Sequence, residues 1–184
     1  PTPLQISKRK KLFIKREDLS GLSLGGNKSR RYEYFFNEIR SKGFTSVLHC
    51  VSLYSNDAAQ ISAAAKIMGM NVHLIFRYDD SSHTDNLSNF TLSNLAGSNL
   101  YVVPNYYVNE YYSNLANNLG ENVYCIRTGL NAYSVELHSI LGCISYVDCF
   151  IELLNQVGDV EVSQIILESG GSSQAGLILA SKFL

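Results

Sequence analysis

The sequence predicts an α/β fold in which mostly parallel strands are covered by helices on both faces. Short apolar runs of strand type alternate with helical segments along nearly the whole chain, and this alternation is typical of βαβ units. The chain has 184 residues, of which 46% are hydrophobic and 17% charged. That composition is typical of a globular protein with a substantial core.

Each element is predicted from its own apolar pattern. Strands are expected where apolar runs lie between turn residues, at 12–16, 47–51, 72–76, 100–103, 123–126 and 165–167. Helices are expected where apolar residues recur every three or four positions, at 32–42, 58–68, 87–95, 108–115, 141–156 and from Gln174 onward. Gly69 is expected to end the second helix, and Asp85 or Asn86 to cap the third.

Charge, cysteine spacing and hydropathy limit the classes of function. A formal net charge of −1 argues against a nucleic-acid binder. The four cysteines have no spacing typical of a metal site, so no metal is expected. We find no signal peptide and no apolar stretch of 18 residues, and therefore expect a cytoplasmic protein without a membrane partner. Because the chain begins at Pro1 and ends at Leu184 within an apolar run, we expect a fragment of a longer protein.

Lys28 is the first candidate for chemistry. It follows Gly25 and Gly26 and precedes an amphipathic helix. A lysine in the first turn of a helix is opposed by the helix dipole, so a purely structural lysine gains little there. A lysine in such a place is a candidate for Schiff-base chemistry with a carbonyl compound. An ordinary solvated loop lysine is the alternative.

Two other segments, each between a strand and a helix, can bind anions. Ser55 and Asn56 follow the 47–51 strand, where free helix amides and short side chains could hold an anion or simply cap the helix. The second segment, SGGSSQAG at 169–176, could form a phosphate cradle of backbone amides and hydroxyls. The alternative there is an ordinary glycine-rich turn.

Together these segments resemble a known family. KREDLSG at 15–21, GGNK at 25–28, SN at 55–56 and SGGSSQAG at 169–176 occur in the order found in the 1-aminocyclopropane-1-carboxylate deaminase and D-cysteine desulfhydrase family. Its members are pyridoxal-phosphate enzymes with the tryptophan-synthase β fold, known as fold type II. The resemblance covers most of the chain.

The resemblance implies a role for each matching residue. Lys28 would form a Schiff base with pyridoxal 5'-phosphate, and Asn56 would bind the phenolic oxygen of that cofactor. Ser55, with the helix start behind it, would hold the substrate carboxylate. The phosphate would be held by four residues of the glycine-rich segment, namely Gly170, Gly171, Ser172 and Ser173.

The resemblance also implies a reaction, a domain division and an assembly. A small amino acid would lose ammonia, as in deaminases, or sulfide and ammonia, as in desulfhydrases. Residues 1–31 and 136–184 would form part of a large domain that holds the cofactor phosphate, and residues 32–135 a small α/β domain. We expect a homodimer.

One position differs from the family, and two other functions stay open. Asp57 stands where the family has His or Gln, and its carboxylate would repel a substrate carboxylate unless it is neutralised or turned outward. The chain could be a truncated or degenerate relative that serves as a binding or assembly protein. It could also catalyse β-replacement, as cysteine synthases do, although their Ser-Gly-Asn-Thr loop is replaced here by the sequence YSND at 54–57.

Overall fold

The computed structural model describes residues 1–7, 12–79, 88–126, 132–168 and 171–184. The strands of the described residues are β1 (Leu4–Ser7), β2 (Leu12–Lys15), β3 (Ser46–Ser52), β4 (Asn71–Tyr78), β5 (Asn99–Pro104) and β6 (Val123–Ile126). The helices are η2 (Glu17–Leu19), α1 (Lys28–Ser41), α2 (Asn56–Met68), α3 (Ser88–Leu95), α4 (Val108–Leu119), α5 (Ala132–Val157) and α6 (Ser172–Phe183).

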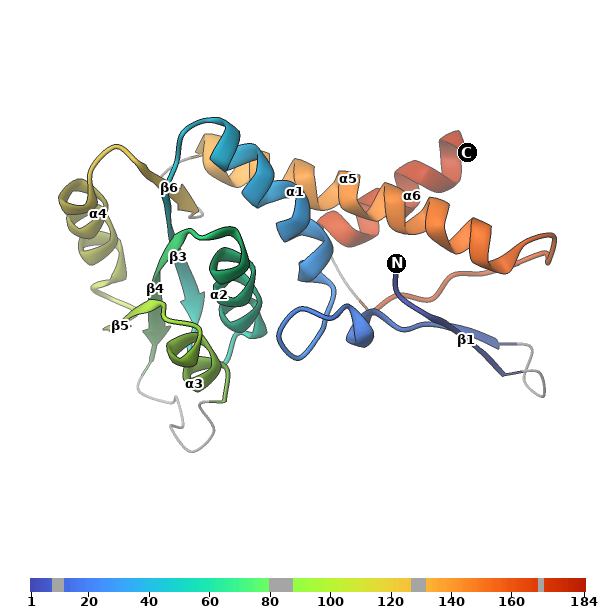
Figure 1. Ribbon diagram of the computed structural model, residues 1–184, viewed down its shortest axis with the longest axis horizontal. Coiled ribbons are helices and arrows are strands. Elements are labelled where there is room, and N and C mark those ends of the chain that lie inside the picture. The colour runs from blue at the N-terminus through green and yellow to red at the C-terminus, as the bar shows by residue number, and fades with distance from the viewer. Residues whose placement is uncertain (8–11, 80–87, 127–131, 169–170) are drawn as a thin grey trace.

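Four strands form a parallel sheet in the order β5-β4-β3-β6. The chain crosses from one strand to the next through helices, as parallel pairing requires. Figure 1 shows this sheet with its helices at one end of the molecule, and α5, α6 and the β1–β2 hairpin at the other. The predicted α/β class with a mostly parallel sheet is confirmed.

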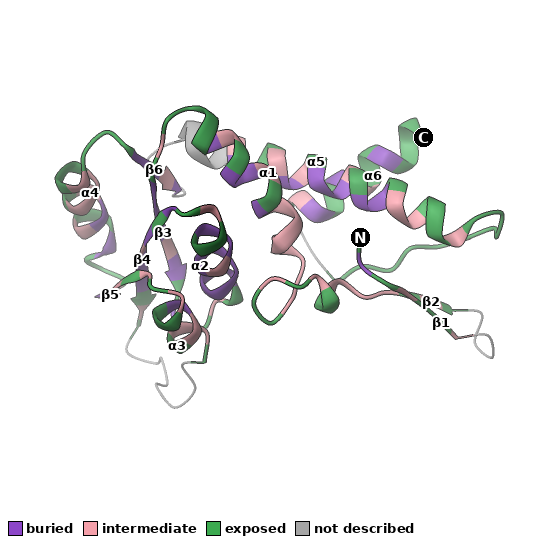
Figure 2. Cartoon of the chain, viewed as in Figure 1, coloured by how far each residue is buried: buried purple, intermediate pink, exposed green. Residues whose placement is uncertain are grey.

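Helices cover both faces of the sheet, as predicted. One cluster of buried residues joins strand residues such as Val47 and Val51 to α1 and α2, and includes Tyr32, Phe35 and Phe36. A second cluster joins Leu48, Ile75 and Val123 to α4, whose Val108 and Tyr112 are buried there. Neighbouring residues of β3 thus face opposite layers, which explains its almost wholly apolar sequence. Figure 2 shows the buried residues gathered along β3, β4 and α2.

Sequence and structure agree for most elements and differ at the two ends. Strand β6 has the predicted bounds, and Gly69 caps α2 in a left-handed conformation with φ 67°. The predicted strand at 12–16 is β2, but its antiparallel partner β1 was not predicted. Helix α5 begins nine residues before the predicted Leu141, and α6 begins at Ser172 rather than after Gln174. The proposed caps Asp85 and Asn86 lie outside the described residues.

The prediction of a strand at 165–167 is wrong. These residues have no regular secondary structure, and Ile165, Ile166 and Leu167 are exposed. An apolar run becomes a strand only where another strand offers hydrogen-bonding partners. Among the described residues, no strand pairs with this segment.

The expectation that no long apolar stretch exists also needs correction. Residues Leu137–Val157 of α5 are long and apolar enough to cross a membrane, judged by length and composition only. Within the fold, however, this helix packs against α1 and α6, and Tyr146, Cys149 and Phe150 are buried. Its Glu152 is paired with two cations. One side of this helix is therefore packed within the fold, and 39% of the apolar window is buried.

Candidate functional site

The turn before α1 places Lys28 at the first position of that helix. Gly25 has φ 80°, and a Cβ there would lie 1.8 Å from the carbonyl oxygen of Asp18, so only glycine fits. The amide of Gly26 donates to the carbonyl of Glu17 at 3.0 Å. The hydroxyl of Ser29 donates to the carbonyl of Gly26 at 2.8 Å. The glycine pair therefore folds the chain back on the Glu17 segment directly before the lysine.

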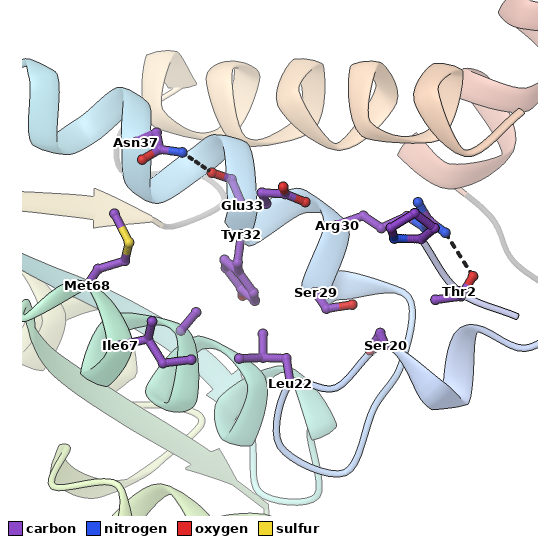
Figure 3. A pocket seen from close by; sticks show the side chains of 12 residues that line it. Thr2, Ser20, Leu22, Ser29, Arg30, Tyr32, Glu33, Asn37, Ile67 and Met68 are labelled. Carbon is purple, nitrogen blue, oxygen red and sulfur yellow. Dashed lines mark hydrogen bonds between the residues drawn. The ribbon is translucent and has the colours of Figure 1, made fainter. Parts of the chain in front are cut away.

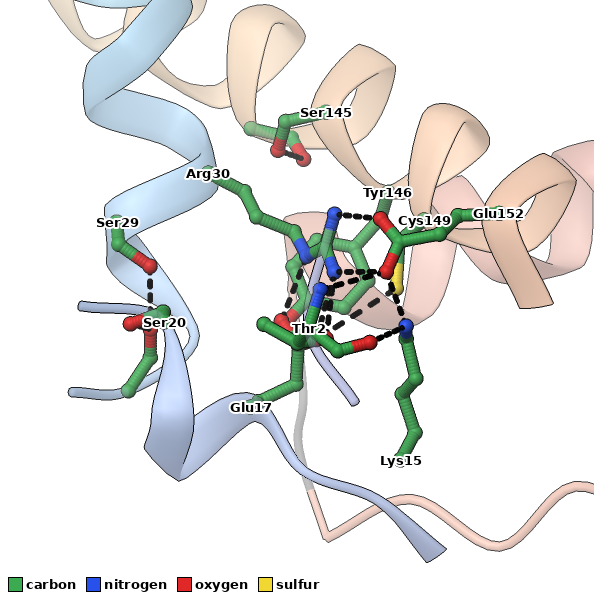
Figure 4. A network of polar contacts seen from close by, with 12 residues as sticks. Thr2, Lys15, Glu17, Ser20, Ser29, Arg30, Ser145, Tyr146, Cys149 and Glu152 are labelled. Atoms are coloured by element: carbon green, nitrogen blue, oxygen red, sulfur yellow. Dashed lines mark hydrogen bonds and ion pairs between the residues drawn. The ribbon is translucent and has the colours of Figure 1, made fainter. Parts of the chain in front are cut away.

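A polar network behind this turn joins α1 to the hairpin and to α5 (Figure 4). The Arg30 guanidinium donates two hydrogen bonds to Glu17, at 2.7 and 2.8 Å, and two to Glu152, at 2.9 and 3.3 Å. Lys15 also pairs with Glu152 and donates to the carbonyl of Thr2 at 2.6 Å. The side chains of these ion pairs are at most 20% exposed. The charged residues of the KREDLSG segment thus fix the position of α1.

Ionisation of the carboxylates in this network is strongly favoured. Burial raises the pKa of Glu152, but hydrogen bonds from Arg30, Lys15 and the amide of Thr2 outweigh it and lower the pKa to about 2. The pKa of Glu17 is lowered too, since Arg30 and Thr2 outweigh its burial. The network is therefore fully charged at neutral pH.

Lys28 lies beside the beginning of α2. Its Nζ donates to Oδ1 of Asn56 at 3.1 Å; Lys28 is half-buried and Asn56 exposed. Ser55 is the N-cap of α2, and its Oγ accepts a hydrogen bond from the amide of Asp57 at 3.3 Å. This helix start follows β3 in the middle of the sheet. Ligands of open α/β sheets bind at the carboxyl ends of strands, which is where these residues lie.

Arg31, three residues after Lys28, extends from α1 to the beginning of α6. Its Nη2 donates to Oγ of Ser172 at 3.1 Å. Residues three apart lie on one face of a helix, so Lys28 and Arg31 point from one face of α1 toward two helix N-termini. The two anion-binding segments predicted from sequence, one at Ser55 and one at Ser172, are thereby brought to the same face of α1.

The beginning of α6 fits a phosphate group. Gly171 precedes it with φ 79°, Ser173 is buried, and the first-turn amides carry the positive end of the helix dipole. Nε of Arg31 is buried without a hydrogen-bond partner among the described residues. A Cβ at Gly142 of α5 would lie 2.6 Å from Oγ of Ser172 and 2.9 Å from Nε of Arg31. A glycine at position 142 therefore leaves room for the Arg31 guanidinium beside the helix start. Gly170 lies outside the described residues.

Asp57 does not point toward the space where a substrate would bind. Its side chain is turned inward, where Oδ1 accepts from the hydroxyl of Tyr32 at 2.5 Å and Oδ2 lies 3.3 Å from Nε2 of His49. Burial raises the pKa of Asp57, but His49 and Tyr32 outweigh it, and the pKa is well below its usual range. The carboxylate is ionised and enclosed, and it is turned inward rather than outward.

Sequence reasoning missed four side chains around the site: Tyr32, His49, Arg31 and His138. Each of these side chains contacts its partner only in the folded chain. Nη1 of Arg31 lies 3.3 Å from the His138 ring, whose pKa is lowered to about 3 by burial and by the charge of Arg31. A neutral His138 can accept a hydrogen bond from that guanidinium. The one available signal was the spacing of Lys28 and Arg31, which places both on one helix face.

A separate cavity of about 310 Å³ lies between α1, α2 and the loop around Leu22. Figure 3 shows Leu22, Ile67 and Met68 on one side and Ser29 with the Tyr32 ring on the other. Neither Lys28 nor Asn56 lines this cavity. Tyr32, one of its lining residues, reaches the site, because its hydroxyl donates to Asp57.

Known proteins with similar sequences were compared with the chain. It is 26% identical to a D-cysteine desulfhydrase of Klebsiella pneumoniae over 188 residues, which cover 96% of this chain and 56% of that protein. It is 35% identical to a 1-aminocyclopropane-1-carboxylate deaminase of Burkholderia ambifaria over 105 residues, which cover 50% of this chain and 31% of that protein. The chain spans about half the length of the relatives that match nearly all of it, from 52% to 60%.

Solved structures also resemble nearly the whole of this chain, which again covers about half of theirs. A crystal structure of an ACC deaminase homologue superposes with a TM-score of 0.77 and 29% identity, covering 97% of this chain and 55% of that one. An L-serine ammonia-lyase from the fungus Rhizomucor miehei has a TM-score of 0.71 at 18% identity, covering 98% of this chain and 55% of that one. The second match shows the fold alone, which is that of fold type II pyridoxal-phosphate enzymes.

The profile of one protein family matches residues 1–182, almost the whole chain. Its description is "Pyridoxal-phosphate dependent enzyme". The ordered motifs, the fold and this match agree on the cofactor. This protein belongs to the family of pyridoxal-phosphate dependent enzymes.

Proposed function

We propose that this chain forms the lysine and phosphate side of a deaminase or lyase that acts on a small amino acid. Its type is that of D-cysteine desulfhydrase or 1-aminocyclopropane-1-carboxylate deaminase, with Lys28 bound to the cofactor as a Schiff base. The observation that carries the proposal is the common face of α1. From that face Lys28 contacts Asn56 at 3.1 Å and Arg31 contacts Ser172 at 3.1 Å.

The surroundings of each residue support the role proposed for it. Ser172, Ser173, Gly171 and Arg31 would hold the phosphate, since a helix N-terminus and a guanidinium both favour an anion. Gly170, predicted to do the same, stays a prediction. When bound, pyridoxal phosphate supplies an electron sink that stabilises negative charge at the substrate α-carbon.

The substrate side lies at the beginning of α2. Ser55 and the first-turn amides would hold the α-carboxylate, and Asn56 would orient the cofactor ring through its phenolic oxygen. Lys28, once displaced by a substrate amine, would take or return a proton at the α-carbon. A lysine amine at hydrogen-bond distance from a fixed amide is well placed for this transfer.

Borohydride trapping tests the role of Lys28. The protein is titrated with pyridoxal phosphate, reduced and digested, and the peptide that carries the added mass is identified. We expect the label on Lys28 and its loss in Lys28→Ala. Lys66→Ala, which removes an exposed lysine of α2, is the control and should label normally. A visible absorbance band that survives in Lys28→Ala would disprove the assignment.

Turnover separates the proposed enzyme from a non-catalytic relative. Sulfide released from D-cysteine, or ammonia from 1-aminocyclopropane-1-carboxylate, should appear with unreduced protein loaded with pyridoxal phosphate and not with Lys28→Ala. A protein that labels at Lys28 but converts neither amino acid would be the binding or assembly protein instead.

We further propose a cytoplasmic homodimer. Exposed apolar side chains on the outer sides of α5 and α6, including Ile144, Ile151 and Ile178, support association because such surfaces are normally covered. Sedimentation equilibrium should give twice the mass of 20.4 kDa. Cell fractionation tests the location, and recovery in the membrane fraction would contradict it.

A further inference from the structure

His49 has an oxygen acceptor at each ring nitrogen. Its Nδ1 lies 3.0 Å from the carbonyl oxygen of Ile126 at the end of β6. Its Nε2 lies 3.3 Å from Oδ2 of Asp57. A neutral imidazole carries one proton and would turn a lone pair toward one of these oxygens. Only the doubly protonated ring donates to both.

Among the described residues that contact His49, Asp57 is the one acidic side chain. Asp57 is 8% exposed and His49 9% exposed. From α1, Tyr32 donates its hydroxyl to Asp57, while Lys28 and Arg31 add positive charge nearby. From α5, the His138 ring lies with its centroid 6.1 Å from that of His49. Its pKa is lowered to about 3 by burial and by Arg31, so it is neutral.

We infer that His49 and Asp57 form a buried charge pair that prepares the beginning of α2 to accept an anionic substrate. His49 cancels the charge of Asp57, and Tyr32 holds the carboxylate inward. Asp57 lies two residues after Ser55, in the same helical turn. The inference rests on the proposed function of Ser55 in holding the substrate carboxylate. His49 and Asp57 are positioning residues, since they act through this turn.

The reason is electrostatic. A carboxylate in the first turn of a helix interacts favourably with the helix dipole and therefore opposes a second anion at the same place. With His49 charged, the pair is neutral and does not repel an anion at the beginning of α2. Without that charge, the Asp57 carboxylate is uncompensated at low dielectric, where the repulsion of two anions is large.

The first experiment reads the charge of His49 without any cofactor. ¹⁵N-labelled protein gives imidazole nitrogen shifts that distinguish a ring with two protons from a ring with one. We expect two protonated ring nitrogens for His49 at pH 7, assigned by their loss in His49→Gln. We expect one in Asp57→Asn, where the counter-charge is gone. A neutral His49 in the unaltered protein would overturn the inference.

The second experiment compares a charged probe with a neutral one. The probes are 1-aminocyclopropane-1-carboxylate and its methyl ester, titrated into protein loaded with pyridoxal phosphate. In His49→Gln we expect the dissociation constant of the acid to rise at least about tenfold, a charge effect, and that of the ester to stay unchanged. The double variant His49→Gln with Asp57→Asn removes both charges and should restore binding of the acid.

Controls separate misfolding and failure of the proposed function from failure of the inference. Thermal unfolding identifies a variant that binds poorly because it is unstable. In that case the inference is tested by whether the double variant recovers binding of the acid. If no form of the protein binds pyridoxal phosphate, the proposed function fails while the nitrogen shifts still test the charge pair. If the cofactor binds and His49→Gln weakens acid and ester equally, the inference is wrong.

Discussion

The amine of Lys28 lies 3.1 Å from Oδ1 of Asn56, although 28 positions separate the two residues. The contact joins the first residue of α1 to the first residue of α2. It requires the glycine turn before α1 and the end of β3 to meet at one point. Two segments that sequence analysis singled out separately thus lie within hydrogen-bond distance.

Replacing Asn56 with alanine should weaken cofactor binding. The side chain offers a hydrogen bond to a charged amine and, in the proposed site, to the cofactor ring. Loss of a hydrogen bond to a charged group costs about 1.5–3 kcal/mol, which is about a tenfold to hundredfold rise in dissociation constant. Absorbance titration with pyridoxal phosphate measures it. Asn117→Ala, at an exposed position of α4, is the control, and equal weakening in both variants would exclude a specific role.

Replacing Arg31 with glutamine should weaken binding of pyridoxal phosphate but not of pyridoxal. The guanidinium lies on Ser172 at the helix start proposed to hold the phosphate. We expect a rise in the dissociation constant of about tenfold or more for the phosphorylated compound. The control is Arg40→Gln, an exposed residue of the same helix. A loss that is equal for both compounds would place Arg31 outside the phosphate site.

Replacing Gly176 with alanine should destabilise the protein. A Cβ there would lie 2.3 Å from the carbonyl oxygen of Cys143 and 2.7 Å from Cβ of Tyr146, so α5 and α6 would have to separate. Overpacking of this kind costs about 1–3 kcal/mol, against about 1 kcal/mol that alanine gains in helix propensity. Urea unfolding measures the difference, with the exposed Ser181→Ala as control. A stabilised Gly176→Ala would show that the helices are not in contact.

Stability should fall in acid through Glu152. Its pKa is lowered to about 2 in the folded protein by Arg30, Lys15 and Thr2, which outweigh burial. The unfolded chain therefore binds a proton at higher pH than the folded chain. This stability is complete above about pH 4.5 and is lost as the pH falls toward 2, with a total of about 2 kcal/mol.

Unfolding midpoints measured from pH 7 to pH 2 check that the stability falls as the pH is lowered. Glu152→Gln should be less stable at pH 7 and should lose less stability across that window than the unaltered protein. Glu161→Gln, at an exposed position, should leave the profile unchanged. A steeper loss in Glu152→Gln would contradict the assignment.

The sequence was sufficient where local pattern decides structure. Strand β6 and the Gly69 cap follow from an apolar run and from a glycine at a left-handed position. It was insufficient where a distant partner decides. Residues 165–167 read as a strand, yet an apolar run needs a neighbouring strand to become one. Arg31 was missed because Ser172 is 141 positions away.

The candidate site shows the same limit. Lys28, Ser55, Asn56 and Ser172 could be chosen from motifs, because glycine turns and helix starts leave a local signature. For Asp57 the sequence could only state what would remove the repulsion, since its partner His49 lies on a strand and contacts it only in the folded chain. Spacing along the chain does not report such contacts.

Helix α1 contacts both the parallel sheet and the other end of the molecule. Its Phe35 and Phe36 are buried under the parallel sheet, while its Arg30 is paired with Glu17 of η2 and with Glu152 of α5. Loosening of either part would therefore displace Lys28, and pyridoxal phosphate bound as proposed would hold both parts together. Occupancy raises stability by RT ln(1 + [L]/Kd) for a ligand that binds only the folded chain. The melting temperature with cofactor thus measures the integrity of the whole fold, remote segments included.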